Sequence, residues 1–459
     1  MQQDSGSFRD KSGYVFTDSG KVLRTIMPCY QGAWDEMDHS GFIARLVEEQ
    51  LLIPFKSSSP LPESYKTLEV EPIPFITYPY EWSFSQLKDA ALQTLTLQQE
   101  ALENGMVLKD ASAYNIQFIG CRPIFIDLLS FEPRVDGKPW ESYKQFCTHF
   151  LAPLALAAKS DLRHLQLSRQ WIDGIPLDIA SGMLSWKAKA SIGLLMHLVL
   201  HASFQSRYSD PRKLTKGNQN TEISLRKLKD IASSLQSTVE KMSFPKQETE
   251  WGDYYEDTNY SDDGTKAKLG IVESVAKLHS GSLAVDLGAN TGRFSRPLAN
   301  HFKTVIAADI DPAAVDIHYR QLQKHGPINI LPIVLDLSSP SPALGWACKE
   351  RKSFVERCEC DMLLALALCH HLHFTCGIQF TQISDFFASL LGPNGVLVVE
   401  FVPKEDSQVQ RMLCARDNDF DDYTLESFCN SFKTNGFNEL SRHSLPNSSR
   451  TLLVMQRVC

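Results

Sequence analysis

Apolar residues in the second half of the chain fall into short runs, each closed by a polar or turn-forming residue and followed by a stretch of helical periodicity. Such runs are typical of strands that are covered on both faces of a parallel sheet. We expect strands at 283–287, 304–308, 328–335, 361–373 and 396–401, and an antiparallel edge strand at 450–455. Helices are expected at 266–279, 312–325 and 380–391. This alternation predicts an α/β domain with a doubly wound, Rossmann-like sheet.

The first half of the chain has a different pattern, in which strand-like alternation gives way to long helical stretches. The pattern predicts a hairpin at 13–27, a helix at 40–52, a strand or strand pair at 68–78 and an amphipathic helix at 85–104. Residues 140–204 and 223–242 are expected to be helical, with a polar loop at 208–220. We therefore expect an α+β domain with a helical extension at 1–245 and the α/β domain at 250–459.

Composition narrows the class of protein. The 459 residues are 43% hydrophobic and 22% charged, which is ordinary for a soluble globular protein. A net charge of −8 argues against general nucleic-acid binding. No apolar stretch is long enough to span a bilayer, the N-terminus lacks an apolar signal region, and the 11 cysteines form no CxxC pair. We expect a cytoplasmic protein with reduced thiols and no metal site.

The glycine-containing stretch at 283–295, LAVDLGANTGRFS, is the strongest candidate for a ligand site. Asp286 lies at the end of a predicted strand, where open α/β sheets bind their ligands. Gly288 and Gly292 allow a sharp turn and a close approach of the backbone to a ligand, and Asn290 favours the turn. A dinucleotide site requires G-x-G-x-x-G, whereas this pattern is D-x-G-x-x-x-G. An acid here would repel a pyrophosphate and suits a cationic amino group.

A second acid, Asp309, ends the next predicted strand at nearly the spacing where a carboxylate binds ribose hydroxyls. Together the loop, the acid and the strand order resemble class I S-adenosylmethionine (SAM) methyltransferases, from about Tyr254 to the C-terminus. The resemblance implies that Asp336 meets the adenine amino group and that Leu337 flanks the ring. It also implies a lid that contains Tyr255 and Tyr260, although these residues could instead anchor the linker. A Rossmann-like domain that binds another ligand is the alternative.

The adjacent histidines His370 and His371 are expected at the C-terminal end of the fourth strand, near the transferred methyl group. An imidazole suits general-base catalysis near neutral pH. Either histidine is therefore a candidate base, and the alternative is a structural role beside the methionine end of SAM. Adjacent residues on a strand point apart, so a metal site is disfavoured.

The N-terminal half contains the pattern Asp110-x4-Asn115, followed by Asp127 after a short predicted hairpin. This pattern resembles the catalytic and metal-binding loops of the aminoglycoside-phosphotransferase and lipopolysaccharide-kinase branch of the kinase superfamily. The resemblance implies that Asp110 is a catalytic base, that Asn115 and Asp127 bind Mg-ATP, and that residues 78–82 form a hinge.

Several features depart from the kinase pattern. No glycine-rich loop is visible, and Leu128-Leu129 follows Asp127. The strand lysine has only Lys21 or Arg24 as candidates, with Glu48 or Glu49 as its partner. An active kinase, a degenerate scaffold and simple turn residues therefore remain as alternatives.

Together these features predict an enzyme that transfers a methyl group from SAM to an oxygen or nitrogen of an unidentified acceptor. A kinase-like lobe beside a methyltransferase is similar to bacterial glycan-capping enzymes, which suggests a glycan or another small molecule as the acceptor. The alternatives are a bifunctional kinase–methyltransferase, an N-terminal scaffold that recognises a macromolecular partner, and a regulator that senses SAM.

Overall fold

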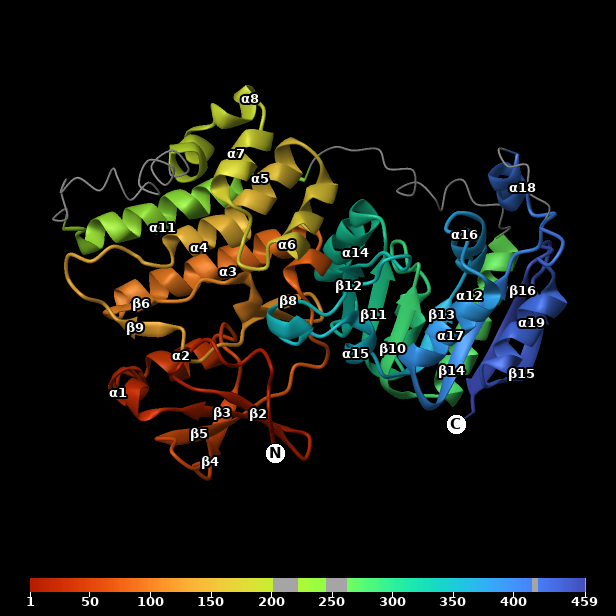
Figure 1. Cartoon of the computed structure of the whole chain (residues 1–459), viewed down its shortest axis with the longest axis horizontal. Coiled ribbons are helices and arrows are strands. Elements are labelled where there is room, and N and C mark those ends of the chain that lie inside the picture. Colours follow the sequence, from red (N-terminus) through yellow and green to blue (C-terminus); the bar gives the residue numbers. More distant parts are fainter. Residues whose placement is uncertain (201–221, 245–261, 415–419, 459) are drawn as a thin grey trace. The chain divides into compact units, whose positions relative to one another are not determined.

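The computed structural model describes residues 1–200, 222–244, 262–414 and 420–458 (Figure 1). The chain divides into two compact units. The first unit comprises Met1–Lys246 together with Leu344–Arg351, and the second comprises Gln247–Ala343 together with Lys352–Cys459.

The second unit is built on a seven-stranded sheet with the order β12-β11-β10-β13-β14-β16-β15. Its first five strands pair in parallel, and β16 pairs antiparallel with both β14 and β15. The strands are β10 Gly281–Leu287, β11 Phe302–Asp309, β12 Ile330–Val334, β13 Cys360–Ala365, β14 Leu391–Phe401, β15 Phe437–Ser444 and β16 Thr451–Arg457. Because β10 lies between β11 and β13, the strand order reverses beside it, which is where doubly wound sheets bind ligands.

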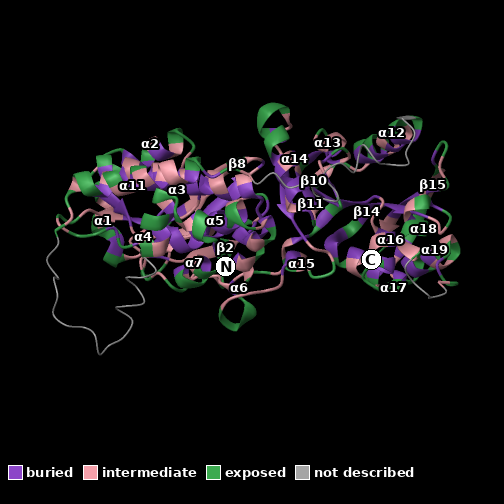
Figure 2. Cartoon of the chain, turned by 90° about the horizontal axis from the view of Figure 1, so that it is seen from above, coloured by how far each residue is buried: buried purple, intermediate pink, exposed green. Residues whose placement is uncertain are grey.

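Helices cover both faces of this sheet (Figure 1). They are α12 Asp262–Leu278, α13 Ser295–Leu298, α14 Pro312–His325, α15 Phe354–Arg357, α16 Cys369–Phe374, α17 Phe380–Leu390, α18 Ser407–Leu413 and α19 Leu425–Thr434. α14 packs against β11 and β12, and α17 packs against β13 and β14. Asp311 caps α14 by accepting a hydrogen bond from the Ala313 amide, and Pro312 occupies the first turn. The central strands form the buried core of the unit (Figure 2).

The prediction of one strand over 361–373 is wrong in its second half. β13 ends at Ala365, and 369–374 form the helix α16. Ala367 adopts a left-handed conformation with φ 50°, which ends the extended backbone. Its amide donates a hydrogen bond to the Glu400 carboxylate instead of to a neighbouring strand. The apolar run in the sequence could not reveal this contact with a residue far along the chain.

The first unit begins with a five-stranded antiparallel sheet in the order β1-β2-β3-β5-β4. Its strands are β1 Gln2–Gln3, β2 Val15–Asp18, β3 Lys21–Ile26, β4 Phe55–Ser58 and β5 Lys66–Val70. Two helices, α1 Gln31–His39 and α2 Phe42–Glu48, connect β3 to β4. The predicted strand at 68–78 is confined to its first residues, because β5 ends at Val70 and prolines interrupt the segment that follows.

A mainly helical region follows this sheet. The long helix α3 Phe84–Glu103 is capped by Ser83 and packs against α11 Leu225–Glu240. Two small antiparallel pairs lie between them in sequence: β6 Met106–Leu108 with β9 Phe131–Pro133, and β7 Ile116–Ile119 with β8 Arg122–Phe125. The shorter helices are α4 Tyr143–Phe146, α5 Ala152–Lys159, α6 Leu167–Gln170, α7 Leu177–Met183, α8 Trp186–Lys189 and α9 Ile192–Leu194.

Searches for a membrane-spanning helix and for a metal site cover the described residues given above. None of the helices there has the length and apolar character needed to cross a membrane. In the same residues, no three His, Cys, Asp or Glu side chains come together as a possible metal site.

Candidate functional site

The loop after β10 carries the glycines that the sequence singles out. Gly288, Asn290 and Gly292 all have positive φ values of 73°, 50° and 76°. A Cβ atom on Gly288 would make an ordinary van der Waals contact with Leu368, at 3.5 Å, so the positive φ and not a steric clash favours glycine here. A Cβ on Gly292 would lie 1.9 Å from the His318 ring, so α14 can approach the loop only if this residue is glycine.

Asp286 is buried beneath this loop, with 2% of its surface exposed. Its Oδ2 accepts a hydrogen bond from the Ser295 hydroxyl at 2.6 Å. Burial raises the pKa of the Asp286 carboxyl to about 7, against the lowering effects of Ser295 and of nearby Lys268, while Asp309 raises it further. A cationic ligand at this carboxyl would favour its ionised form.

Asp309 ends β11 and connects it to the glycine loop. Its Oδ2 accepts a hydrogen bond from the Asn290 amide at 2.7 Å, and its Oδ1 accepts one from the Asp311 amide at 2.9 Å. Burial raises the pKa of this carboxyl to about 6, while these backbone amides lower it. The carboxylate therefore orients the loop and still presents lone pairs at the end of the strand.

Asp336 and Leu337 follow β12 and are half-buried. Asp336 accepts hydrogen bonds from the amide and the hydroxyl of Ser338, at 2.8 and 2.7 Å. The structure thus places an acid at or just beyond the C-terminal ends of three neighbouring strands, β10, β11 and β12. The expected lid residues Tyr255 and Tyr260 lie outside the described residues.

His370 and His371 lie on α16 rather than at a strand end, and their ring centroids are 4.2 Å apart. His370 is 1% exposed, and within the described parts of the chain its Nδ1 has no hydrogen-bond partner. His371 is only half-buried. Burial lowers the pKa of His370, and burial with Arg450 nearby lowers the pKa of His371 to about 4. Both imidazoles are therefore neutral near pH 7 and present a lone pair, while the lowered pKa makes each a weaker base than a free imidazole.

Two ion pairs at this edge of the sheet were not predicted. Lys268 on α12 pairs with Glu400 on β14 at 2.7 Å, and both side chains are almost fully buried. Arg450 pairs with Asp406 at 2.7 Å and is equally enclosed. The one sequence signal was Glu400, an acid at the end of an apolar run; nothing local marked Lys268 as its partner.

In the first unit, the structure brings Asn115 and Asp127 together through Ser130. The Asn115 amide donates to the Ser130 hydroxyl at 3.2 Å, and this hydroxyl donates to Asp127 Oδ2 at 2.5 Å. Arg24 pairs with Asp127 Oδ1 at 2.6 Å. The expectation of a Glu48 or Glu49 partner for Arg24 is therefore wrong.

The other two predicted positions also have their own partners. Lys21, the alternative to Arg24, pairs with Glu69 instead of Glu48 or Glu49. Asp110 accepts hydrogen bonds from the Ser112 amide and from Gln145, and burial together with the Asp127 charge raises its pKa.

The segment Leu344–Arg351 belongs to the first unit although it lies between β12 and β13 in the sequence. Glu350 accepts two hydrogen bonds from Arg9, at 2.9 and 3.0 Å. The Arg351 guanidinium lies 4.3 Å from the ring centroid of Tyr114, the neighbour of Asn115. Both contacts join this segment to other residues of the first unit.

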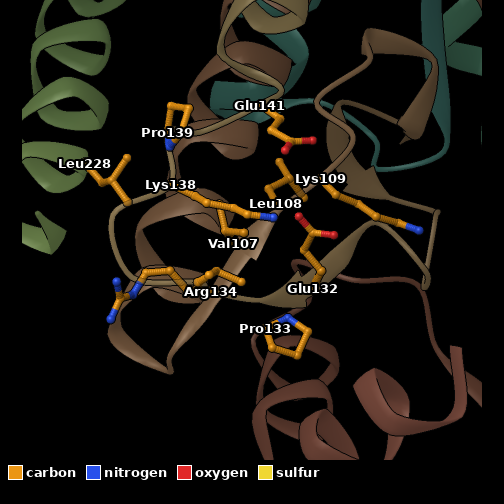
Figure 3. Close-up of a pocket in the computed structure, with 11 residues that line it drawn as sticks. Val107, Leu108, Lys109, Glu132, Pro133, Arg134, Lys138, Pro139, Glu141 and Leu228 are labelled. Atoms are coloured by element: carbon orange, nitrogen blue, oxygen red, sulfur yellow. The ribbon is translucent and has the colours of Figure 1, made fainter. Parts of the chain in front are cut away.

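A small hollow lies elsewhere in the first unit (Figure 3). Its lining mixes charged and apolar side chains from β6, β9, the residues that follow each of these strands, and Leu228 of α11. None of the residues singled out by the sequence patterns lines it, so it is not the candidate site.

The sheet order and the loop after β10 together define the class. The second unit has the fold of class I SAM-dependent methyltransferases, with the acid-and-glycine loop at its switch point. No family model matches the chain. It belongs to the family of the nodulation protein NoeA of Rhizobium meliloti (strain 1021), with 35% identity over 469 residues that cover 99% of this chain and 96% of that protein.

Two solved methyltransferases are similar to part of the chain. The N-methyltransferase NodS from Bradyrhizobium japonicum WM9 is 16% identical, with a TM-score of 0.33, and covers 43% of this chain and 99% of its own. Magnesium protoporphyrin IX methyltransferase (ChlM) from Synechocystis PCC 6803 is 18% identical, with a TM-score of 0.33, and covers 45% of this chain and 92% of its own.

Proposed function

We propose that the second unit is a SAM-dependent methyltransferase that acts on an oxygen or nitrogen atom of its acceptor. The observation that carries this proposal is the buried carboxyl of Asp286 beside a positive-φ glycine loop. Asp309 and Asp336, at the ends of the two neighbouring strands, support it.

The residues present fit SAM. Asp286 would face its ammonium group, Asp309 its ribose hydroxyls, and Asp336 with Leu337 its adenine. When bound, SAM supplies a methyl group on a sulfonium, which is already electrophilic. The chain then has two tasks: to orient the acceptor in line with that methyl group, and to accept a proton. Neutral His371 or His370 performs the second task.

Binding of SAM to the full chain, measured by calorimetry, tests this proposal. The double variant Asp286→Ala/Gly288→Ala is expected to abolish binding. The matched control is Asp385→Ala/Gly270→Ala: Asp385 is exposed, and a Cβ on Gly270 meets nothing within 4 Å. Equal affinities of the first variant and the wild type would overturn the assignment.

Our proposal for the acceptor rests on the name of the relative and not on the geometry of the site. The name of the relative, nodulation protein, suggests a role for this chain in nodulation, and we propose a glycan or another small molecule as the acceptor. Transfer of isotope-labelled methyl from SAM into fractionated host extract identifies the acceptor class. Label in a macromolecular fraction would contradict a small acceptor.

For the first unit we propose a kinase-like fold that serves as a recognition scaffold. The hairpin β2–β3, the helix α2, the long helix α3 and the short hairpin β7–β8 before Asp127 support it, since they occur in the order on which the resemblance rests. The residues fit a Mg-nucleotide poorly, because the Asp127 carboxylate that would bind the metal is already paired with the Arg24 cation at 2.6 Å.

The scaffold proposal has its own test. In the full chain, the double variant Asn115→Ala/Asp127→Ala is expected to transfer methyl groups at the wild-type rate. The acceptor in this assay is the fraction that the labelling experiment identifies. Titration with Mg-ATP is expected to give no binding heat. Tight Mg-ATP binding, or label transfer that requires ATP, would instead favour the bifunctional kinase–methyltransferase.

A further inference from the structure

We propose that Lys268 is a positioning residue that holds the two loops on either side of Asp286 in the conformation that receives the methionine end of SAM. This inference rests on the proposed methyltransferase function and deepens it, since Lys268 belongs to none of the sequence motifs. The argument starts from the burial of its charge.

Lys268 projects from α12, is 1% exposed and pairs with Glu400, which is fully buried. Enclosing two charges costs most of the free energy that their attraction returns, so an apolar pair would stabilise the fold equally well. The buried pair is therefore better explained by what it orients than by the stability it adds.

The pair holds the loop after β13. Glu400 Oε2 accepts a hydrogen bond from the Lys268 ammonium at 2.7 Å and another from the Ala367 amide at 2.8 Å. That contact stabilises the left-handed conformation of Ala367. The next residue, Leu368, faces Gly288, and α16 with His370 begins directly afterwards. Glu400 thereby sets the position of this loop against the glycine loop.

Lys268 also contacts the end of the glycine loop directly. Its ammonium lies 5.1 Å from the ring centroid of Phe294, in cation–π range. Ser295, the next residue, donates the hydrogen bond to Asp286. The groups that act on the Asp286 carboxyl are Ser295, Asp309 and Lys268, and Lys268 lowers its pKa. Lys268 thus favours the ionised form of the acid that would face the SAM ammonium.

The test uses Lys268→Met in the full chain. In the ligand-free protein, hydrogen–deuterium exchange at 366–369 and 289–294 is expected to become faster. The affinity for SAM should fall between about 3- and 30-fold, the range for residues that act through others. Because Lys268 lowers the pKa of Asp286, the pH midpoint of SAM binding should also move upward.

A second variant guards against simple misfolding. In Lys268→Met/Glu400→Gln no buried carboxylate is left unpaired, and the glutamine carbonyl can still accept the Ala367 amide. In this variant, residues 366–369 should exchange hydrogen as slowly as in the wild type. The pH midpoint of SAM binding should still be raised. The control Arg450→Met breaks an equally buried ion pair whose cation does not act on Asp286. Arg450→Met should lower the free energy of unfolding about as much as Lys268→Met does, without moving the pH midpoint of SAM binding.

Each outcome is decisive. Unchanged loop exchange in Lys268→Met, together with an unchanged pH midpoint in both Lys268 variants, would overturn the positioning role. Absence of SAM binding by the wild type would overturn the proposed function instead, and the exchange experiment on ligand-free protein tells the two failures apart.

Discussion

Asp286 shows how strongly the fold controls the chemistry of a single residue. Its carboxyl has a pKa of about 7 in the folded chain, compared with 3.8 in a model compound. Between these two values the folded state holds a proton that the unfolded state has released. The stability that this proton contributes is present at low pH and is lost as the pH rises towards 7.

Asp286→Asn removes this titration. The free energy of unfolding of the variant, relative to the wild type, should be higher at pH 8 than at pH 4 by up to about 4 kcal/mol, because one pKa unit corresponds to about 1.4 kcal/mol. Urea unfolding of both proteins at the two pH values measures the difference. If the variant and the wild type differ in free energy of unfolding by the same amount at pH 4 and pH 8, the pKa of the Asp286 carboxyl is not shifted.

His371 is the histidine of the pair with access to solvent, and its pKa of about 4 keeps it neutral. His371→Gln should lower kcat about 100-fold or more while SAM affinity changes little, since general-base catalysis contributes at least this much. At saturating SAM, protonation of His371 should not lower the wild-type kcat between pH 8 and 5.5, because its pKa lies below this range. The control is His301→Gln, at the residue just before β11. A wild-type kcat in His371→Gln would leave His371 a packing role.

At the scale of elements, the glycine loop and α14 depend on each other. His318 on α14 is fully buried, and neither of its ring nitrogens has a hydrogen-bond partner among the residues that the structure describes. Its ring occupies the space beside Gly292. The loop conformation is therefore set by the helix behind it as well as by its own glycines.

Gly292→Ala should destabilise the chain by about 2–4 kcal/mol, because the new methyl group clashes with His318 at a backbone position with φ 76°. His318→Ala should relieve part of this cost, since it removes the clash but not the backbone strain. Thermal unfolding of the two single variants and the double variant measures the coupling. Simple additivity of the two effects would contradict the close approach of loop and helix.

At the scale of the whole molecule, the chain does not divide at one point. It leaves the first unit, forms β10 to β12, contributes Leu344–Arg351 to the first unit, and returns to form β13. The Glu350 side chain is 2% exposed in its pair with Arg9, so this segment is anchored rather than loosely attached.

This anchoring is testable through Lys349 and Arg351, the trypsin sites on either side of Glu350. Glu350→Ala in the full chain should speed cleavage at these sites by about tenfold, because proteolysis follows the population of the locally opened state. Glu359→Ala, at an exposed position, is the control. If both variants are cleaved at the wild-type rate, Glu350 does not hold the segment.

Much of the second unit was predictable because its signals are local. The apolar runs correctly predicted β10, β11, β12 and β14, and Gly288 and Gly292 marked the loop. The helical position of His370 and His371 was not predictable, since it depends on a turn at Ala367 that Glu400 stabilises. In the first unit, β4 and α1 have weak patterns and take their form from the packing around them.

By itself the sequence determined the positions that constrain the backbone locally: glycines where φ is positive, caps at helix starts, and apolar strands that must be buried. These requirements involve near neighbours in the chain. Only the tertiary structure decided which charges meet. Lys268 and Glu400 are 132 positions apart, and Arg24 and Asp127 are 103 apart. A side chain's charge does not specify its partner until folding brings the two together in a region of low dielectric, where their interaction becomes strong.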